Sequence, residues 1–505
     1  MESRMYFYDR QSRARGPQLR TRRPRIHGLG MPARELKQKL KLLSLLPHSV
    51  QSNGNNVALT PAAVDPKIYD GLEKYLIAKP LQDCLNAVMK NNEFQGIKAA
   101  LVDLTKGVSQ PAFAGFNHKS QVFAASVPKI ATLLAAFQLR HDLRVALNAK
   151  TPKPTTLANL FDVVRDDWAK TQGRGAAAAF TRGVSLSGKL VVANRIFVTL
   201  AGPTVPELDR VFADVATGKP LTVEFRSTGE SATALQTIVN DYNLKDEENE
   251  IRAAKAELNG AKTVATRKAA QKRLTEAVQK RDAAKTTKRA PARLKILALG
   301  FLERLGIAVG GDVPASNLAT SLIVRDLGYP YIISTLLQTG LYDTNRNGGL
   351  WLGADYGGSE WRGALIGGAS QSATAGSVAA YYTLLAQNAL VSSQASTEMK
   401  LFLQKSPHLH FPGTGSWFKQ GLQELKDSGS IKTLLAKVGL AGGADDCALI
   451  EREVDAGGGK KVLLRYVAVA LRARDGNVLR RLIREFDKCI LLNNKLTPAQ
   501  GGHST

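Results

Sequence analysis

The stretch Phe123-Ala-Ala-Ser126-Val-Pro-Lys129-Ile-Ala-Thr-Leu-Leu134 is the most informative part of the chain. Ser126 and Lys129 are three residues apart at the start of an apolar run, so a helix places both side chains on one face, one turn apart. A serine hydroxyl is a poor nucleophile at its free pKa and needs a neighbouring base. A lysine amine serves as that base once burial or nearby cations lower its pKa. The pattern therefore predicts Ser126 as a nucleophile and Lys129 as its base.

The flanking segments place this serine between a small sheet and a buried helix. Residues 96–105 are predicted to form a strand, and residues 112–118 follow a turn as its hairpin partner. Residues 130–139 contain no Gly or Pro and predict a helix. Pro128 fits the first turn of that helix, where proline loses no backbone hydrogen bond.

In this context the chain resembles the serine β-lactamase and penicillin-binding-protein superfamily, most closely the class A-like β-lactamases, whose motifs are S-x-x-K, S-D-N and K-T-G. The resemblance implies an α/β (α+β) fold, with an antiparallel sheet flanked by helices, an all-helical subdomain and, in this chain, a large insertion. It also implies a serine hydrolase that forms an acyl-enzyme at Ser126, uses no cofactor and no metal, and opens a β-lactam or a related amide or ester.

The second family motif aligns with residues 315–317, which precede an apolar helical run. Ala315, Ser316 and Asn317 take the places of Ser, Asp and Asn, so only the asparagine matches. Asn317 is expected to bind a substrate amide and to hold Lys129, because a carboxamide offers a donor and an acceptor. Ala315 lacks the hydroxyl that shuttles a proton in the family. Ser316 would supply this hydroxyl only if the alignment of the motif were shifted by one residue.

The third motif aligns with Lys437-Val438-Gly439-Leu440, expected on a central strand. The resemblance implies that Lys437 attracts a substrate carboxylate, while Gly439 lets substrate lie close to the strand. It also implies an oxyanion hole formed by the backbone N–H groups of Ser126 and Leu440. Val438 replaces the hydroxyl residue of the motif.

The C-terminal part predicts the rest of the sheet. Residues 461–472 form a long apolar strand, and a helix after Gly476-Asn477 carries its apolar side chains on one side, namely Leu479, Leu482, Ile483, Phe486 and Ile490. Residues 370–392 resemble the capped helix that follows the active-site loop in class A enzymes, with Thr374 or Ser372 as the N-cap.

A deacylating base is harder to assign. In class A enzymes a glutamate in a Glu-x-x-Leu-Asn signature activates the water that cleaves the acyl-enzyme. Glu360 lies close to the corresponding place, but Trp361-Arg362-Gly363 follows it and the Leu-Asn half is absent. Glu360 is the candidate base, and an exposed loop carboxylate is the alternative interpretation.

The chain has 505 residues and a formal net charge of +26, with arginines crowded into its first 25 residues. Such a segment buries too little apolar surface to fold alone, so disorder is expected. It is interpreted as a solubilising tail or the product of a misplaced start codon, with contact to nucleic acid or an anionic surface as the less favoured alternative. No apolar run reaches the ~20 residues of a membrane span, and no signal-peptide core is visible.

The segment between the serine and the asparagine is longer than a class A enzyme needs. Residues 245–288 are predicted to form one long charged helix, ended by Pro291, which is either a solvated helix with charge pairs or an arm for self-association or a partner. Strand-like stretches precede it at 190–199 and 221–226. The three cysteines, Cys84, Cys447 and Cys489, are interpreted as small core residues.

These observations predict a discontinuous domain organisation: a basic segment (1–60), a serine hydrolase domain (61–150 and 292–495), an inserted region (151–291) and a flexible tail (496–505). The expected partner is a small-molecule substrate. Two alternatives to the hydrolase remain: an inactive relative that binds a carboxylate-bearing ligand, and an interaction protein that acts through its basic segment and charged helix.

Overall fold

The structure is a computed structural model. It describes residues 78–149, 160, 223–310, 314–327, 332, 335–336, 339–343, 348–352, 356, 371–405, 416–425, 429–456 and 460–496. The basic N-terminal segment, the predicted strand at 190–199 and Glu360 lie outside these residues. All the described residues belong to one compact unit of the chain.

The largest sheet has five antiparallel strands in the order β2-β1-β10-β9-β8. Their bounds are β1 Lys98–Asp103, β2 Ala112–Phe116, β8 Ser430–Leu440, β9 Ala444–Asp455 and β10 Lys461–Ala473. Strands β1 and β2 are neighbours in both the chain and the sheet, as are β8, β9 and β10. Strand β1 pairs with β10, which joins the two groups.

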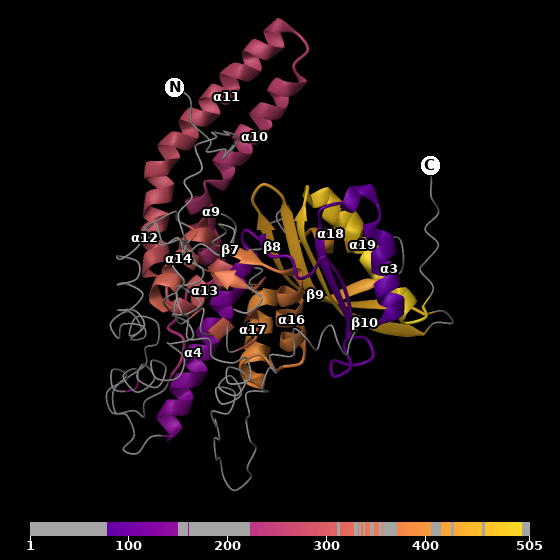
Figure 1. The fold of residues 1–505 in the computed structure, drawn as a ribbon. Helices are drawn as coiled ribbons and strands as arrows, with labels where there is room; N and C mark the ends of the chain where they lie inside the picture. The colour runs from indigo at the N-terminus through magenta and orange to yellow at the C-terminus, as the bar shows by residue number, and fades with distance from the viewer. Residues whose placement is uncertain are drawn as a thin grey trace, which may run out of the picture. The chain divides into compact units, whose positions relative to one another are not determined.

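Helices cover both faces of this sheet (Figure 1). On one face lie α3 (Lys79–Met89), α18 (Trp417–Gln423) and α19 (Gly476–Asn493), and on the other lies α16 (Ala375–Ala386). Side chains alternate between the faces of a strand. Along β9, Cys447 and Leu449 accordingly join the apolar cluster on the α16 side, whereas Ala448 and Ile450 join the cluster on the α19 side.

The remaining elements surround the end of the sheet near Ser126. In one small sheet, β7 (Gln371–Ala373) pairs with β3 (Val122–Phe123) on one side and β6 (Trp351–Leu352) on the other. In a second, β4 (Tyr342–Asp343) pairs with β5 (Gly348–Gly349). The other helices near the site or its core are η2 Val127–Lys129, α4 Ile130–Ala149, α9 Ala232–Asn243, α12 Ala290–Ala298, α13 Phe301–Gly310, α14 Ala315–Leu327 and α17 Ser393–Lys405. The short helix η1 (Asn92–Phe94) contacts α3 and α19 on the other face of the sheet.

The structure confirms the predicted α+β class, with an antiparallel sheet flanked by helices. The predicted hairpin corresponds to β1 and β2, the helix after Lys129 to α4, and the C-terminal strand and helix to β10 and α19. Thr374 is the N-cap of α16, because its hydroxyl accepts a hydrogen bond from Ser377 N at 3.1 Å. The expectation that Lys437 lies on a central strand is wrong: β8 is the edge strand of the described sheet.

The prediction of one long charged helix over 245–288 is also wrong. The segment forms two helices, α10 (Lys245–Gly260) and α11 (Val264–Ala284), which lie side by side (Figure 1). Helix α10 ends at Gly260, and Thr263 caps α11 through a reciprocal hydrogen-bonded box with Thr266. Ion pairs link the two helices across the hairpin, such as Arg273–Glu257 at 2.9 Å and Lys280–Glu250 at 2.6 Å.

Two neighbouring predictions need correction as well. Pro291 does not end the helical segment, because it lies in the first turn of α12, where proline is tolerated. The described residues 223–226 form no strand, although Val223 and Phe225 are buried in the same apolar cluster as α4.

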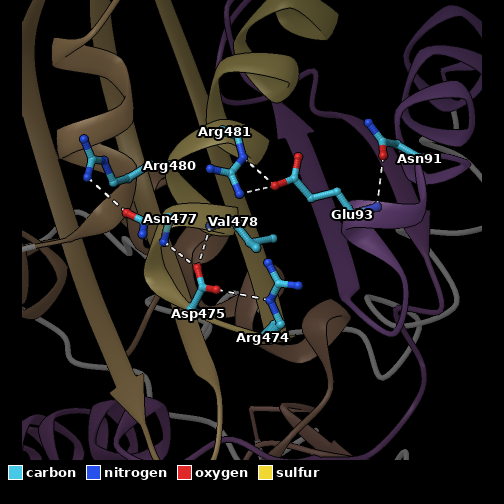
Figure 2. Close-up of polar contacts among 8 residues, drawn as sticks. All are labelled: Asn91, Glu93, Arg474, Asp475, Asn477, Val478, Arg480 and Arg481. Atoms are coloured by element: carbon cyan, nitrogen blue, oxygen red, sulfur yellow. Dashed lines mark hydrogen bonds and ion pairs between the residues drawn. The ribbon is translucent and has the colours of Figure 1, made fainter.

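The N-terminus of α19 is fixed by polar contacts (Figure 2). The carboxylate of Asp475 accepts hydrogen bonds from Asn477 N at 2.9 Å and from Val478 N at 3.0 Å, which satisfies two otherwise unpaired helix donors. One turn later, Arg481 forms an ion pair with Glu93 of η1. This ion pair attaches α19 to the first described segment of the chain.

The interpretation of the cysteines as core residues holds for Cys447, a buried thiol, and for Cys489, which is fully buried, but it missed a disulfide. Cys84 of α3 and Cys489 of α19 form a disulfide with a Cα–Cα distance of 5.6 Å. The pairing of β1 with β10 brings the first and last long described segments together, so cysteines separated by 405 residues become neighbours. Within the described residues, no helix combines the length and apolar character that crossing a membrane requires.

Candidate active site

Ser126 lies in a tight turn between β3 and η2. Ala124 N donates to Gln371 O at 3.1 Å, and Val127 N donates back to Ala124 O at 2.9 Å. Between them, Ala125 has a φ of +44°. A non-glycine residue in this left-handed region costs about 1–2 kcal/mol, so the surrounding contacts must hold the turn. The turn leaves Ser126 half-buried, with its side chain at the start of η2.

Lys129 is fully buried, at 0% exposure. Its Nζ lies 2.8 Å from Ser316 Oγ and 2.7 Å from Asn317 Oδ1, both on the first turn of α14. The ring of Tyr356 lies beneath the same nitrogen, with its centroid 4.4 Å away. Lys129 thus joins the helix that begins after Ser126 to α14.

The environment of Lys129 favours the neutral amine. Burial lowers the pKa of Lys129 well below its usual value, and the positive charge of Lys437 lowers it further. The aromatic face of Tyr356 acts in the opposite direction, because a ring quadrupole attracts a cation. A lysine with a depressed pKa holds more unprotonated amine near neutral pH, and this is the form that takes a proton.

Residues 315–317 of the second predicted motif lie beside Lys129. Ser316 is 1% exposed, and its hydroxyl donates to Ala308 O at 2.7 Å while it accepts from Lys129. Asn317 is partly buried, and among the described residues no acceptor lies within hydrogen-bonding reach of its Nδ2. Ala315 N donates to Asn243 Oδ1 of α9 at 2.8 Å, which anchors the start of α14.

The third predicted motif lies on β8, close to the nucleophile. A Cβ added to Gly439 would lie 2.8 Å from Ala124 O and 3.2 Å from Ser126 N. Only glycine permits so close an approach of the strand to the Ser126 turn. Lys437, two residues earlier on the same face, is buried, and Leu440 at the end of the strand is 69% exposed.

Two residues of this region were not identified from the sequence. Asp445 pairs with Gly439 across β8 and β9, and its Oδ1 accepts a hydrogen bond from Arg472 N at 2.7 Å. Burial raises the pKa of Asp445 to about 6. The other residue is Tyr356. It was not identified because a single tyrosine in a glycine-rich stretch has no characteristic spacing from other residues. Asp445 would have been found by recognising residues 444–455 as a strand that pairs with the lysine-bearing one.

The remaining predicted site residue, Glu360, lies outside the described residues. The part of the chain that is described contains no cluster of three or more His, Cys, Asp or Glu side chains suited to a metal ion.

Comparisons with known proteins find only distant similarity. No family model and no curated protein matches the chain. A β-lactamase from Sphaerobacter thermophilus DSM 20745 is similar in structure, with a TM-score of 0.35 and 13% identity over 83% of this chain and 98% of that one. A β-lactamase from Burkholderia phymatum gives a TM-score of 0.34 and 10% identity over 82% of this chain and all of the other.

Proposed function

We propose that the protein is a serine hydrolase of the β-lactamase type, which forms an acyl-enzyme at Ser126. One observation carries the proposal: a fully buried lysine, one turn after the serine, has its amine hydrogen-bonded to Ser316 and Asn317 and its pKa depressed. Burying a lysine is costly, and this one has the neutral partners Ser316 and Asn317 and no carboxylate among the described residues. Such an amine is suited to accept the proton of a nearby hydroxyl.

In the proposed reaction, neutral Lys129 takes the proton from Ser126 Oγ as the oxygen bonds to the acyl carbon. The backbone N–H groups of Ser126 and Leu440 stabilise the resulting oxyanion. The C–N bond then breaks, and the leaving nitrogen receives the proton held by Lys129. Water later cleaves the ester and restores the serine hydroxyl.

The side chains around the cleft favour an amide or ester that carries a carboxylate. Lys437 supplies a positive charge on the face of β8 that bears Gly439, and Asn317 Nδ2 is available to donate to a substrate carbonyl. The edge position of β8 leaves one side of its backbone for an extended substrate. A β-lactam has these features, and a peptide-like amide is the second candidate.

Glu360 is our candidate base for the deacylating water. If it has this role, Glu360→Gln should still acylate but accumulate the covalent adduct, because only the second step loses its base. Rapid turnover without any adduct, unchanged in this variant, would contradict the role.

A carboxylate-binding protein without turnover is the second candidate function. It is favoured by Ser316, whose hydroxyl is already engaged by Ala308 O and Lys129, and by Ala315 and Val438, which lack hydroxyls. Proton delivery to a leaving group then has fewer routes, so the binding protein is expected to hold its ligand without forming the acyl-enzyme.

Labelling with a fluorescent penicillin, followed by intact-mass measurement, tests both candidates. The hydrolase gains the mass of the β-lactam on wild-type chain and none on Ser126→Ala. A folded wild-type chain that binds the penicillin reversibly, gains no mass and does not hydrolyse it supports the binding protein instead. Binding to DNA that weakens with salt would support the interaction protein.

A further inference from the structure

Tyr356 connects three segments of the proposed active site. Its hydroxyl donates to Ala125 O at 2.9 Å, immediately before the nucleophile, and its ring lies 4.4 Å from Lys129 Nζ. Its backbone N donates to Ser321 Oγ at 3.1 Å, and that hydroxyl donates to Asn317 O at 3.0 Å. The tyrosine therefore touches the serine turn, the lysine and the helix that carries Asn317.

The hydroxyl contact bears on the orientation of one particular peptide group. Ala125 O and Ser126 N belong to the same planar trans peptide, so the C=O and the N–H point in opposite directions. A hydrogen bond that fixes the carbonyl also fixes the N–H. Ser126 N lies close to Gly439. In the proposed reaction it is one of the two N–H groups that bind the oxyanion.

The hydroxyl contact also helps to hold the strained backbone conformation of Ala125. Ala125 has a φ of +44°, which an alanine adopts only when neighbours hold it. Without the tyrosine hydroxyl, the peptide between Ala125 and Ser126 is free to rotate toward a more relaxed geometry, and its N–H turns away from the oxyanion site.

The ring contact bears on the amine. Among the described residues, the titratable groups that face Lys129 Nζ are Lys437 on β8 and Tyr356 itself; its hydrogen-bond partners, Ser316 and Asn317, are neutral. The ring face stabilises the ammonium form, opposite to the effect of burial and of Lys437. It also fills the space on that side of the amine with an apolar group.

We propose that Tyr356 is a positioning residue for acylation: its hydroxyl aims the Ser126 N–H at the oxyanion, and its ring holds the Lys129 amine and moderates its basicity. This inference rests on the proposed function, because both roles act on the attack by Ser126.

Two substitutions separate the two roles. Tyr356→Phe keeps the ring and removes the hydroxyl, so acylation should slow by about tenfold or more, the loss of one well-aligned hydrogen bond in the transition state. The concentration of penicillin that half-saturates the rate should stay within about twofold of wild type, and the pH profile should not shift. Tyr356→Leu keeps an apolar group but removes the ring, so the acidic limb of the acylation pH profile should move to lower pH by about half a unit.

The measurement is the rate of mass gain with a fluorescent penicillin between pH 5 and 9. Tyr381→Phe is the matched control: it removes a buried hydroxyl in α16 that has no partner among the described residues, so its acylation rate should equal that of wild type. Thermal unfolding of each variant confirms that it is folded, and if the leucine variant does not fold, the phenylalanine variant still tests the hydroxyl role.

Three outcomes would overturn the inference. Acylation of Tyr356→Phe at the wild-type rate removes the role of the hydroxyl, and an unshifted profile in folded Tyr356→Leu removes that of the ring. A wild-type chain that neither gains mass at Ser126 nor hydrolyses the penicillin overturns the proposed function, and the role of Tyr356 falls with it. The wild-type arm thus distinguishes the two failures.

Discussion

The Nζ of Lys129 lies 2.7 Å from Oδ1 of Asn317, a contact between residues 188 positions apart in the chain. It makes the protonation of Lys129 sensitive to the side chain at position 317. In Asn317→Asp, a carboxylate next to the amine favours the ammonium form and raises the pKa of Lys129. Less neutral amine is then present at each pH, so the acidic limb of the acylation profile should move to higher pH. Single-turnover rates across pH check this, and Asn317→Ala, which adds no charge, should slow acylation without the upward shift.

Replacing the proposed base should nearly abolish acylation. We expect Lys129→Ala to slow it by about 10²–10⁴, the usual contribution of a positioned general base, and Ser126→Ala to remove it. Lys106→Ala, which removes an exposed lysine in the turn after β1, serves as the control and should retain the wild-type rate. Unchanged acylation of either site variant would rule out the assignment.

Gly439→Ala should separate the strand β8 from the Ser126 turn. The new methyl group would meet two backbone atoms, Ala124 O and Ser126 N, at 2.8 and 3.2 Å, and backbone cannot move aside as a flexible side chain does. We expect at least about a tenfold loss of acylation, because a small displacement of oxyanion donors is costly. Gly260→Ala is the matched control, since nothing lies within 4 Å of its added Cβ. Its acylation rate should match wild type.

The buried carboxyl of Asp446 should make folding stability depend on pH. Burial raises its pKa to about 7, although Ser416 Oγ and Phe418 N donate hydrogen bonds to it. The folded state therefore holds the proton more tightly than the unfolded state, and the stability this gives is present below about pH 4 and lost as the pH rises to about 7. Relative to wild type, Asp446→Asn should gain stability across this window and stay level above it. Denaturant unfolding of both proteins at pH 4, 6 and 8 checks the sign.

The disulfide between Cys84 and Cys489 should stabilise the fold measurably. Closing a long loop restricts the unfolded chain, and native disulfides typically contribute about 2–4 kcal/mol. Reductant should therefore lower the midpoint of thermal unfolding of the wild type. In the double variant Cys84→Ser, Cys489→Ser, the midpoint should already be low and should not respond to reductant. An equal response of both proteins would show that the bond does not form.

Whether a feature could be predicted from the sequence depended on how far apart in the chain its interacting residues lie. The helix after Ser126 and the C-terminal helix were predicted because their apolar periodicity is local. The hairpin of α10 and α11 was missed because both helices have high helix propensity; the Asn259-Gly260 dipeptide and the Thr263 cap were the local signals for the break. The β9 strand was missed because Asp445 and Asp446 interrupt its apolar pattern, although both are buried.

Within the candidate site, residue types could be predicted but contacts could not. Lys129 and Asn317 come from motifs, and the structure brings them together. The engagement of Ser316 with Ala308 depends on how α13 packs against α14. The place of Tyr356 depends on contacts with segments more than 30 residues away, and no spacing rule encodes such contacts.

The covalent link between α3 and α19 also determines what a protease can achieve. Because the bond joins residues 84 and 489, any single cut between them yields two fragments that remain attached. On a gel without reductant, such a nicked molecule keeps the mobility of a single species, and the fragments separate only after reduction. Partial proteolysis can thus map exposed segments between the two cysteines while both pieces stay in one molecule.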